Sequence, residues 1–302
     1  MAPPRPKVNT ASRAPPFMVL SDGSGSSKTA PPAIPGKGLV PTERARLRFS
    51  ITGNAIVTGG AGDIGSVACR ALLEHGLQGL AIFDVHSHEG HTIARQFQED
   101  FPHATVTFSQ VDVTDAELVA DAVGTAEAQL GGAINIALCF AGITHAVHAL
   151  DLEPHDWRRM FEVNTTGAFL VAQAAARSMA TKGTGGSIVL MASISAHVAN
   201  FPQPQVHYNA SKAALISAKS SLAAEWARYG IRVNSISPGY MDTILNEGDT
   251  LEQHRRAWAA RLPYGRMGQP EELTGAIVLL CSQAGSYITG ADILVDGGLT
   301  IF

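Results

Sequence analysis

The sequence predicts a doubly wound α/β fold, in which one parallel sheet of seven strands carries helices on both faces. Two observations support this prediction. The candidate strands are apolar throughout, as expected for strands buried on both sides, and they alternate with helix-like stretches of ten or more residues. The expected strands are 55–58, 80–83, 105–111, 134–140, 187–192, 232–237 and 292–295.

The helices expected between these strands begin with residues typical of helix starts. Pro154 and Pro270 suit a first helical turn, where the N–H that proline lacks has no partner anyway, and Asp115 follows Thr114 near another start. We find no internal repeat and expect a single domain over residues 46–302. The expected helices are 64–75, 88–101, 115–130, 154–180, 207–229 and 270–281.

The composition indicates a protein that works on small molecules. A net charge of −4 and a pI near 6.2 give no electrostatic reason to bind nucleic acid or an anionic membrane. No apolar stretch approaches the roughly 20 residues that span a bilayer. The three cysteines are widely spaced and form no CxxC or Cys/His cluster, so we expect a reducing, cytoplasmic compartment and no metal site.

The first 45 residues differ from the rest of the chain. Nine of the 16 prolines lie there beside a Ser/Gly run at 21–27, and such a segment buries too little surface to offset its ordering entropy. We expect residues 1–45 to form a flexible arm. Basic residues such as Arg5, Lys7 and Arg13 make mitochondrial targeting the minority alternative, which the prolines oppose because they disfavour an amphipathic helix.

A glycine-rich turn follows the first strand and opens the first helix. Gly60, Gly62 and Gly65 satisfy G-x-G-x-x-G, in which glycines let the backbone approach a pyrophosphate at the helix N-terminus. A turn chosen only for its conformation is the alternative. The position between strand and helix favours a Rossmann-type dinucleotide site, with expected cofactor contacts at Gly59, Gly62, Asp63, Ile64 and Gly65.

Asp84 ends the second strand, where a carboxylate accepts hydrogen bonds from the ribose hydroxyls of a dinucleotide. A 2′-phosphate would meet like charge there. No Lys or Arg lies between Gly59 and Cys69 or in the four residues after Asp84. These features favour NAD over NADP, and an acid solvated at the strand end is the alternative.

Tyr208 and Lys212 stand one helical turn apart, so on a helix their side chains share a face. An isolated tyrosine has a pKa of about 10, and a neighbouring ammonium lowers that pKa by favouring the phenolate. The spacing predicts a tyrosine that exchanges protons near neutral pH. A solvated helix face is the alternative for the pair taken alone.

Together these motifs resemble the short-chain dehydrogenase/reductase family over about residues 50–302. The T-G-x-x-x-G-x-G turn, Asn164, Ser193, Tyr208-x-x-x-Lys212, a Pro-Gly at 238–239 and a terminal Asp-Gly-Gly occur in the family's order. Segments 201–205 and 235–240 look like the fungal polyol dehydrogenases acting on mannitol, arabinitol, sorbose or xylulose. The resemblance implies NAD(P)-dependent interconversion of a secondary alcohol and a ketone, with a sugar alcohol and its ketose as the expected pair. A carbonyl reductase of secondary metabolism and an inactive binding scaffold are the alternatives.

Carried over position by position, the resemblance makes Tyr208 the general acid/base and Lys212 its electrostatic partner, which also holds the nicotinamide ribose. Tyr208 and Lys212 are therefore expected cofactor contacts as well. It implies that Ser193 hydrogen-bonds the reacting oxygen, with Ser195 as the competing candidate. Asn164 is expected to kink its helix and hold a proton-relaying water, or merely to satisfy backbone groups. The further cofactor contacts it implies are Asp112, Val113, Ala141, Gly142, Pro238, Gly239 and Thr243.

Two positions depart from the family pattern. Asp63 replaces the middle glycine of the turn, which puts a carboxylate near the phosphates or lets it cap the helix N-terminus. The usual Asn-Asn-Ala-Gly becomes Cys139-Phe140-Ala141-Gly142, which keeps the Ala-Gly for close cofactor approach but removes polar side chains that tie the sheet together.

Specificity is expected to come from a lid at about residues 241–268, which is rich in charge and aromatics. Polar residues elsewhere are candidates for contact with sugar hydroxyls, and placement on a loop surface is their alternative. The helices expected at 154–180 and 207–229 carry more apolar surface than one sheet face covers, so we expect a homotetramer. The candidate substrate contacts are His145, Ser195, Asn200, Gln205 and Tyr240.

Overall fold

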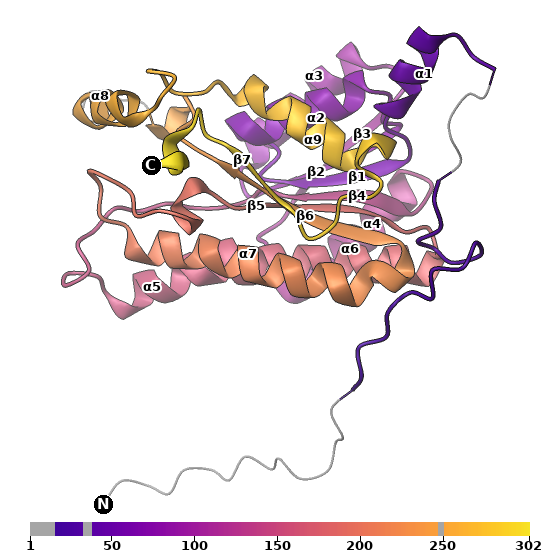
Figure 1. Cartoon of the computed structure of the whole chain (residues 1–302), viewed down its shortest axis with the longest axis horizontal. Helices are drawn as coiled ribbons and strands as arrows, with labels where there is room; N and C mark the ends of the chain where they lie inside the picture. Colours follow the sequence, from indigo (N-terminus) through magenta and orange to yellow (C-terminus); the bar gives the residue numbers. More distant parts are fainter. Residues whose placement is uncertain (1–15, 33–37, 247–250) are drawn as a thin grey trace, which may run out of the picture.

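The computed structural model describes residues 16–32, 38–246 and 251–302, and a parallel sheet forms its centre (Figure 1). Its strands run in the order β3-β2-β1-β4-β5-β6-β7, and every neighbouring pair is parallel. The predicted seven-stranded, doubly wound fold is confirmed, with each strand within one residue of its expected bounds. The strands are β1 Asn54–Thr58, β2 Gly79–Asp84, β3 Thr105–Gln110, β4 Ile134–Cys139, β5 Gly186–Met191, β6 Ile231–Pro238 and β7 Asp292–Val295.

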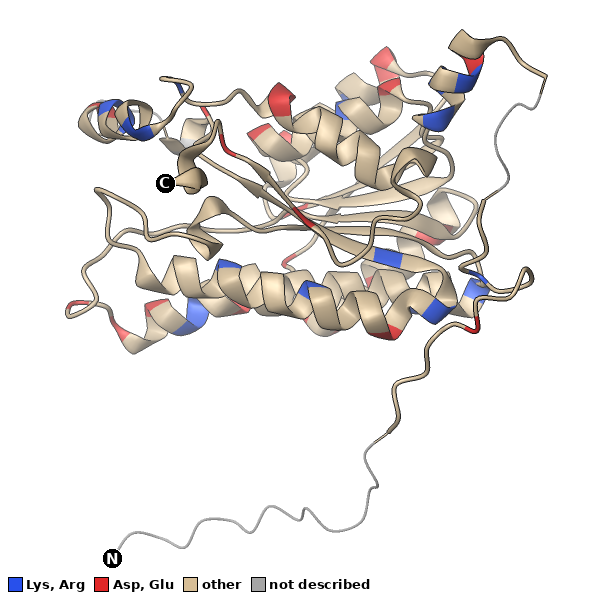
Figure 2. Ribbon diagram, in the orientation of Figure 1, with Lys and Arg blue, Asp and Glu red and all other residues tan. Residues whose placement is uncertain are grey.

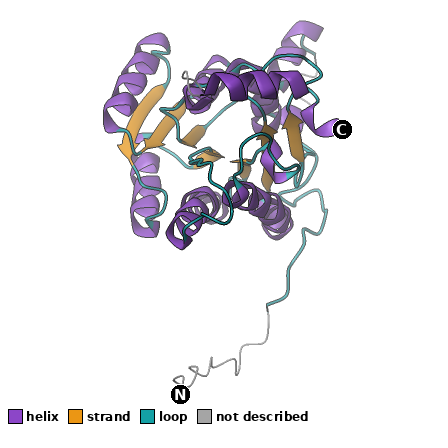
Figure 3. Cartoon of the chain, turned by 90° about the vertical axis from the view of Figure 1, so that its left-hand side faces the viewer, coloured by secondary structure: helices purple, strands orange, loops and turns teal. Residues whose placement is uncertain are grey.

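Helices form a layer on each face of the sheet (Figures 1 and 3). Alternate residues of one strand enter opposite cores: Ile56 packs in the core beneath α4, α6 and α7, whereas Ala55 and Val57 pack in the core beneath α2, α3 and α9. This double burial explains the unbroken apolar runs in the sequence. The helices are α2 Asp63–Glu74, α3 Ser87–Asp100, α4 Ala116–Gln129, α5 Pro154–Phe161, α6 Ala168–Lys182, α7 Val206–Trp226, α8 Glu252–Arg261 and α9 Thr274–Cys281.

The helix expected at 154–180 is not continuous, because a π-helix at Glu162–Gly167 separates α5 from α6. Two tertiary contacts hold this irregular turn. Asn164 binds the backbone of Ile143, and Gly167 lies so close to Val113 that an added Cβ would stand 2.5 Å from its methyl group. The kink expected at Asn164 is therefore present in the structure as a π-helical turn.

A short helix that the sequence did not predict, α1 Pro41–Arg48, crosses the expected boundary between arm and domain. None of its residues is buried, so no apolar stripe marked it. Residues 1–15 and 33–37 of the expected arm lie outside the described part of the chain. Residues 16–32 contain no helix or strand, and Lys28 Nζ donates to the Gly183 carbonyl at 2.7 Å. The division into arm and domain stays a prediction.

The strand order reverses between β1 and β4, and this switch point positions the site. Loops that leave neighbouring strands in opposite directions open a crevice at the carboxyl end of a parallel sheet. The glycine turn follows β1, and residues 140–142 follow β4, with Thr58 paired to Cys139 in register. Figure 3 looks onto this end of the sheet.

Charged residues of both signs are interspersed along the helices (Figure 2). Among the helices that the structure describes, none is long and apolar enough to cross a membrane.

Candidate active site

Tyr208 and Lys212 share one face of α7, as the spacing predicts. The Lys212 ammonium lies 5.7 Å from the centre of the Tyr208 ring. It donates at 2.7 Å to the carbonyl of Met191, the last residue of β5. The lysine is almost completely buried, whereas the tyrosine is only partly buried, so α7 places the ammonium inside the end of the sheet and leaves the phenol accessible from the cleft.

The pKa values of this pair are set mainly by burial. Burial raises the pKa of Tyr208, while a hydrogen bond with the Ser193 hydroxyl lowers it and the nearby Tyr240 raises it. Burial lowers the pKa of Lys212 to about 8. In the structure, burial raises the tyrosine pKa more than the Ser193 hydroxyl lowers it, and the predicted lowering of that pKa by the Lys212 ammonium stays a prediction.

Two serines follow β5 in the turn that begins at Ser193. The Ser193 hydroxyl accepts from Ser195 N at 3.1 Å and donates to Ser195 Oγ at 3.0 Å. Both serines line the same cleft as Tyr208, but only Ser193 is a hydrogen-bond partner that shifts the tyrosine pKa. The geometry favours Ser193 over Ser195 as the partner of the phenol.

Asn164 connects the π-helix to its surroundings through its amide. It is completely buried, accepts from Ile143 N at 2.8 Å and donates to Ile143 O at 3.0 Å and to Ser211 Oγ at 3.1 Å. Ser211 lies between Tyr208 and Lys212 on α7. The alternative role, satisfying backbone groups, is therefore realised, and the same amide joins the π-helix to the tyrosine–lysine turn.

A cleft of about 200 Å³ collects most of the predicted side chains. Candidate substrate contacts Ser195, Asn200, Gln205 and Tyr240 all line it. His145 does not, because its side chain is exposed and its ring packs edge-on to His207, with 5.8 Å between the ring centres. The other predicted residues that line the cleft are Ile64, Gly142, Ser193, Tyr208, Lys212, Pro238, Gly239 and Thr243.

The cleft also contains polar residues that sequence reasoning missed. Thr144, Gln203 and Asn246 line it, and Trp258 donates from behind its wall to Gln203 Oε1 at 2.9 Å. Gln203 is two residues from the predicted Gln205, so alternation along that loop was an available signal. For Trp258, which was expected only as one of the aromatic residues of the lid, no signal pointed to the contact with Gln203, because the two residues lie in separate parts of the chain.

The glycine turn has the shape that a dinucleotide requires. Gly59 adopts a left-handed conformation with φ 66°, and a Cβ on Gly65 would lie 2.0 Å from the Gly59 carbonyl oxygen. The turn leads directly into α2, whose first N–H groups have no partner within the helix. The fold and the turn therefore fit a pyrophosphate at this helix end.

Asp84 and Asp112 lie on neighbouring strand ends beside the turn. Asp84 accepts from Ala61 N and from His86 N, both at 3.1 Å, so its carboxylate is joined to the glycine turn. Val111 N donates to Asp84 O, which places Asp112 alongside. Asp112 accepts from the backbone and hydroxyl of Thr114, and these bonds lower its pKa. Val113 is buried against the π-helix.

The carboxylate of Asp63 does not cap its own helix. The N-cap of α2 is Gly62, and no side chain caps it. Instead Asp63 Oδ2 accepts from Ile244 N at 2.7 Å, directly after Thr243. This departure from the family pattern therefore connects the nucleotide turn to the start of the expected lid.

Thr58 ties the sheet together at the point where Cys139 and Phe140 carry no polar side chain. Its hydroxyl accepts from Phe140 N at 3.0 Å and Ala141 N at 3.1 Å, which fixes the backbone after β4. Gly142 follows at a close approach, since an added Cβ would lie 3.2 Å from Asn164 Oδ1. The sequence did not identify Thr58 in this role.

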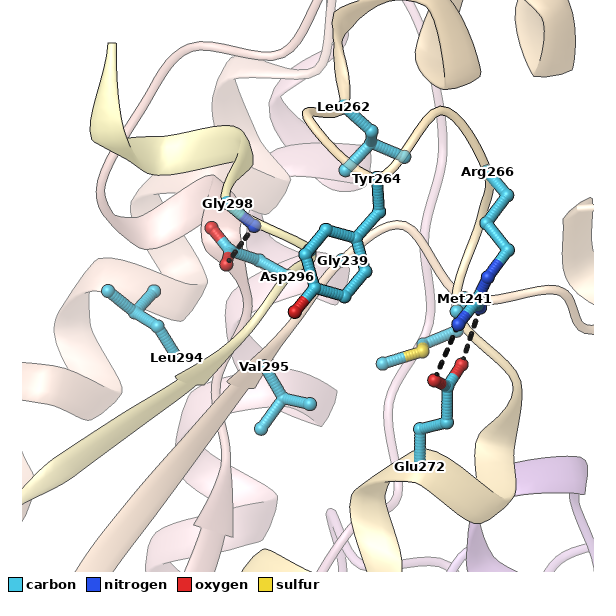
Figure 4. Close-up of a pocket in the computed structure, with 12 residues that line it drawn as sticks. Gly239, Met241, Leu262, Tyr264, Arg266, Glu272, Leu294, Val295, Asp296 and Gly298 are labelled. Carbon is cyan, nitrogen blue, oxygen red and sulfur yellow. Dashed lines mark hydrogen bonds and ion pairs between the residues drawn. The ribbon is translucent and has the colours of Figure 1, made fainter.

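The expected lid region joins the cleft to a second cavity of about 420 Å³, which shares Gly239 and Met241 with it (Figure 4). Here Arg266 binds Glu272 through two bonds of 2.7 and 2.8 Å, and this pairing holds the Glu272 pKa at about 2. None of the predicted catalytic side chains lines this cavity. Residues 247–250 of the expected lid lie outside the described part of the chain, and the lid stays a prediction.

A crevice shaped for a dinucleotide and a partly buried phenol beside it are features of NAD(P)-dependent oxidoreductases, and the chain is a member of that class. A family model described as enoyl-(acyl carrier protein) reductase matches residues 59–300. The chain belongs to the short-chain dehydrogenase/reductase family.

Curated relatives and solved structures support the same family assignment. The chain is 37% identical over 253 residues to galactitol 2-dehydrogenase (L-tagatose-forming) of Cereibacter sphaeroides, covering 82% of this chain and 95% of the relative. It is 34% identical over 257 residues to D-arabinitol 2-dehydrogenase (ribulose-forming) of Candida tropicalis, covering 80% and 90%. The crystal structure of a gluconate 5-dehydrogenase from Burkholderia cenocepacia, in complex with NADP and tartrate, matches with a TM-score of 0.78 and 34% identity, covering 85% and 99%.

Proposed function

We propose that this protein interconverts a sugar alcohol and its ketose at a secondary carbinol carbon. The cluster of hydroxyl and amide groups around Tyr208 is the observation that carries the proposal. A polyol brings several hydroxyl groups into the site, and each one left without a partner costs ~1–3 kcal/mol. The relatives named for galactitol and D-arabinitol support the same substrate class. Hydroxyl and amide groups suited to such a ligand stand around Tyr208 on Ser193, Ser195, Asn200, Gln203 and Gln205.

In this proposal Tyr208 takes the proton of the substrate hydroxyl during oxidation and returns it during reduction. Ser193 lines the same cleft as the phenol, and it orients the reacting oxygen. Asn164 and Lys212 position the Tyr208 phenol, and Asn164 holds the water that relays protons. The crevice beside Tyr208 would hold a nicotinamide, which when bound would supply the hydride chemistry. Oxidation should accelerate as the pH rises through the apparent pKa of the Tyr208–Lys212 pair, because the phenol must lose its own proton before it can take that of the substrate.

We propose NAD as the preferred cofactor. Asp84 is almost buried beside the turn, so a 2′-phosphate would meet a carboxylate that little water screens. The family itself uses both dinucleotides, and the gluconate 5-dehydrogenase structure holds NADP. The cofactor contacts proposed are those predicted from the sequence, from Gly59 through Thr243.

We further propose a cytoplasmic homotetramer. Trp157 on α5, Phe169 on α6 and Val206 on α7 each leave more than a third of their surface exposed, which supports a partner surface on this side of the sheet. Light scattering of the purified protein measures the assembly directly, and a monomer at micromolar concentration would contradict it.

The experiment that tests the function is a steady-state assay with NAD and NADP against pentitols, hexitols and ketoses. We expect the highest kcat/KM with a polyol–ketose pair and with NAD. Absence of turnover with every sugar, together with reduction of apolar ketones, would replace the proposal by a carbonyl reductase. No turnover with any substrate and retained dinucleotide binding would indicate a binding scaffold.

A further inference from the structure

One wall of the cleft is a polar network built from three separate parts of the chain. Tyr240 follows β6, Asn200 and Gln203 lie in the loop before α7, and Trp258 lies on α8. The Tyr240 and Trp258 rings stack with 4.5 Å between their centres and 9° between their planes. The network therefore holds both the position and the plane of the Tyr240 ring.

Trp258 fixes the orientation of the Gln203 amide. An indole N–H only donates, so the atom of Gln203 that faces it at 2.9 Å is the amide oxygen. The amide nitrogen of Gln203 then faces the other way and donates to the Tyr240 oxygen at 3.1 Å. The buried indole N–H of Trp258 thus determines that the amide nitrogen of Gln203, and not its oxygen, faces Tyr240.

Tyr240 receives a second donor from the opposite side. Asn200 Nδ2 donates to the same phenol oxygen at 2.7 Å. With both acceptor directions taken, the phenol hydrogen has to point away from the two amides, and Tyr240 lines the cleft beside Tyr208. Burial raises the pKa of Tyr240, so the phenol keeps this hydrogen at working pH.

The same wall offers an acceptor without a partner. Among the described residues, Asn200 Oδ1 is buried and makes no hydrogen bond. An unpaired buried carbonyl costs ~1–3 kcal/mol, and this one, which exposes almost no surface, is a cost of the orientation that lets Asn200 donate to Tyr240.

We infer that Tyr240 is a specificity-determining residue that donates to a substrate oxygen other than the reacting one, and that Gln203 and Trp258 are the positioning residues that keep its hydrogen aimed into the cleft. The inference rests on the proposed function and deepens it: the favoured substrates carry a further hydroxyl near the reacting carbon. A ketone with a single oxygen cannot use this contact.

The first test combines Tyr240→Phe with ketoses that lack one hydroxyl at a time. The substitution keeps the ring stacked on Trp258 and removes the hydroxyl, which is both the proposed donor to substrate and the acceptor of the Asn200 and Gln203 amides. We expect kcat/KM for the parent ketose to fall about 10-fold, the worth of one buried hydrogen bond. For one deoxyketose we expect wild type and Tyr240→Phe to be equal, because neither the enzyme nor that substrate then completes the bond.

Trp258→Phe tests the positioning role. Without the indole N–H, Gln203 is free to turn its oxygen toward Tyr240, whose hydrogen then goes to Gln203 instead of to substrate. We expect a loss of about 3–10-fold on the parent ketose, and we expect the double variant Tyr240→Phe/Trp258→Phe to be no worse than Tyr240→Phe alone. Trp226→Phe at the end of α7, which removes an indole outside the cleft, serves as the matched control and should leave kcat/KM unchanged.

The outcomes separate the inference from the function beneath it. Two results would overturn the inference alone, provided that wild type turns over ketoses. In the first, the loss of kcat/KM caused by Tyr240→Phe adds to the loss caused by every deoxy substitution. In the second, Tyr240→Phe has the same kcat/KM as wild type on the parent ketose. Additive losses in the double variant would overturn the role of Trp258. No turnover of any polyhydroxy substrate would remove the proposed function and the inference together. Tyr240→Phe and Trp258→Phe leave buried amide groups unpaired, so their thermal midpoints should fall, and NAD dissociation constants equal to wild type exclude unfolding at the assay temperature as the cause.

Discussion

We expect the Asp63 carboxylate to weaken cofactor binding, and its replacement to strengthen it. In the structure its carboxylate stands in the first turn of α2, where the pyrophosphate is expected, and it binds Ile244 N at 2.7 Å. A carboxylate and a phosphate ~4–6 Å apart repel by about 1 kcal/mol in water and by several kcal/mol at the lower effective dielectric of a partly buried site. The attraction between the phosphates and the N-terminus of α2 is the same in all variants. The Asp63 carboxylate therefore reduces the free energy of cofactor binding by about 1–3 kcal/mol.

Asp63→Asn removes the charge and keeps an oxygen that accepts from Ile244 N. We expect NAD to bind about 5–100-fold more tightly at low salt, by conversion of that cost at 1.4 kcal/mol per tenfold. The gain should shrink above 0.1 M salt, where charges are screened over ~10 Å. Asp63→Gly, which restores the family's turn, removes the hydrogen bond as well, so the difference between the two variants reports the worth of the contact with Ile244.

The assay is a titration of NAD by fluorescence quenching or calorimetry at two salt concentrations. Asp121→Asn on the exposed face of α4 loses the same charge outside the turn and should leave the dissociation constant unchanged. Equal affinities of wild type and Asp63→Asn at low salt, or a gain shared by Asp121→Asn, would refute the electrostatic reasoning.

Three further changes test the structure. Lys212 has a pKa of about 8 in the folded state against a usual value of 10.5, so between these values the native state binds fewer protons and the free energy of unfolding increases as the pH rises. This increase, of up to about 3 kcal/mol, should be smaller in Lys212→Met when unfolding is measured from pH 8 to 10. Gly65→Ala places a Cβ 2.0 Å from the Gly59 carbonyl oxygen, so its thermal midpoint should fall, whereas Gly275→Ala, with no atom within 4 Å, should raise it slightly. Thr58→Val strands the N–H groups of the two residues it binds and should cost about 2–4 kcal/mol in urea unfolding, with Thr58→Ser close to wild type; equal stabilities of the two Thr58 variants would contradict this.

The order and bounds of the strands were predictable because their cause is local. A strand covered on both faces must be apolar at every position, and this pattern appears in any short window of sequence. The π-helix had no such pattern, because its cause is contact between Asn164 and Ile143 and between Gly167 and Val113. Likewise α1 carries no buried residue, so periodicity had nothing to mark.

The candidate site was predictable where its motif lies within one segment. The tyrosine and lysine lie on one helical turn, and the glycine turn occupies eight consecutive residues. Convergence was not predictable: Trp258 meets Gln203 across 55 residues of sequence, and Asp63 meets Ile244 across 181. His145 shows the opposite error, since a polar residue near the right strand packs on His207 instead of entering the cleft.

The central claim, that Tyr208 moves the substrate proton, is tested most directly by the turnover of Tyr208→Phe with the best polyol and NAD. General acid/base groups contribute about 10²–10⁴-fold, so we predict a loss of kcat in this range with NAD affinity and thermal midpoint close to wild type. Tyr287→Phe, which changes a fully exposed tyrosine in the same way, should be as active as wild type. A Tyr208→Phe protein with near-normal kcat would contradict the account.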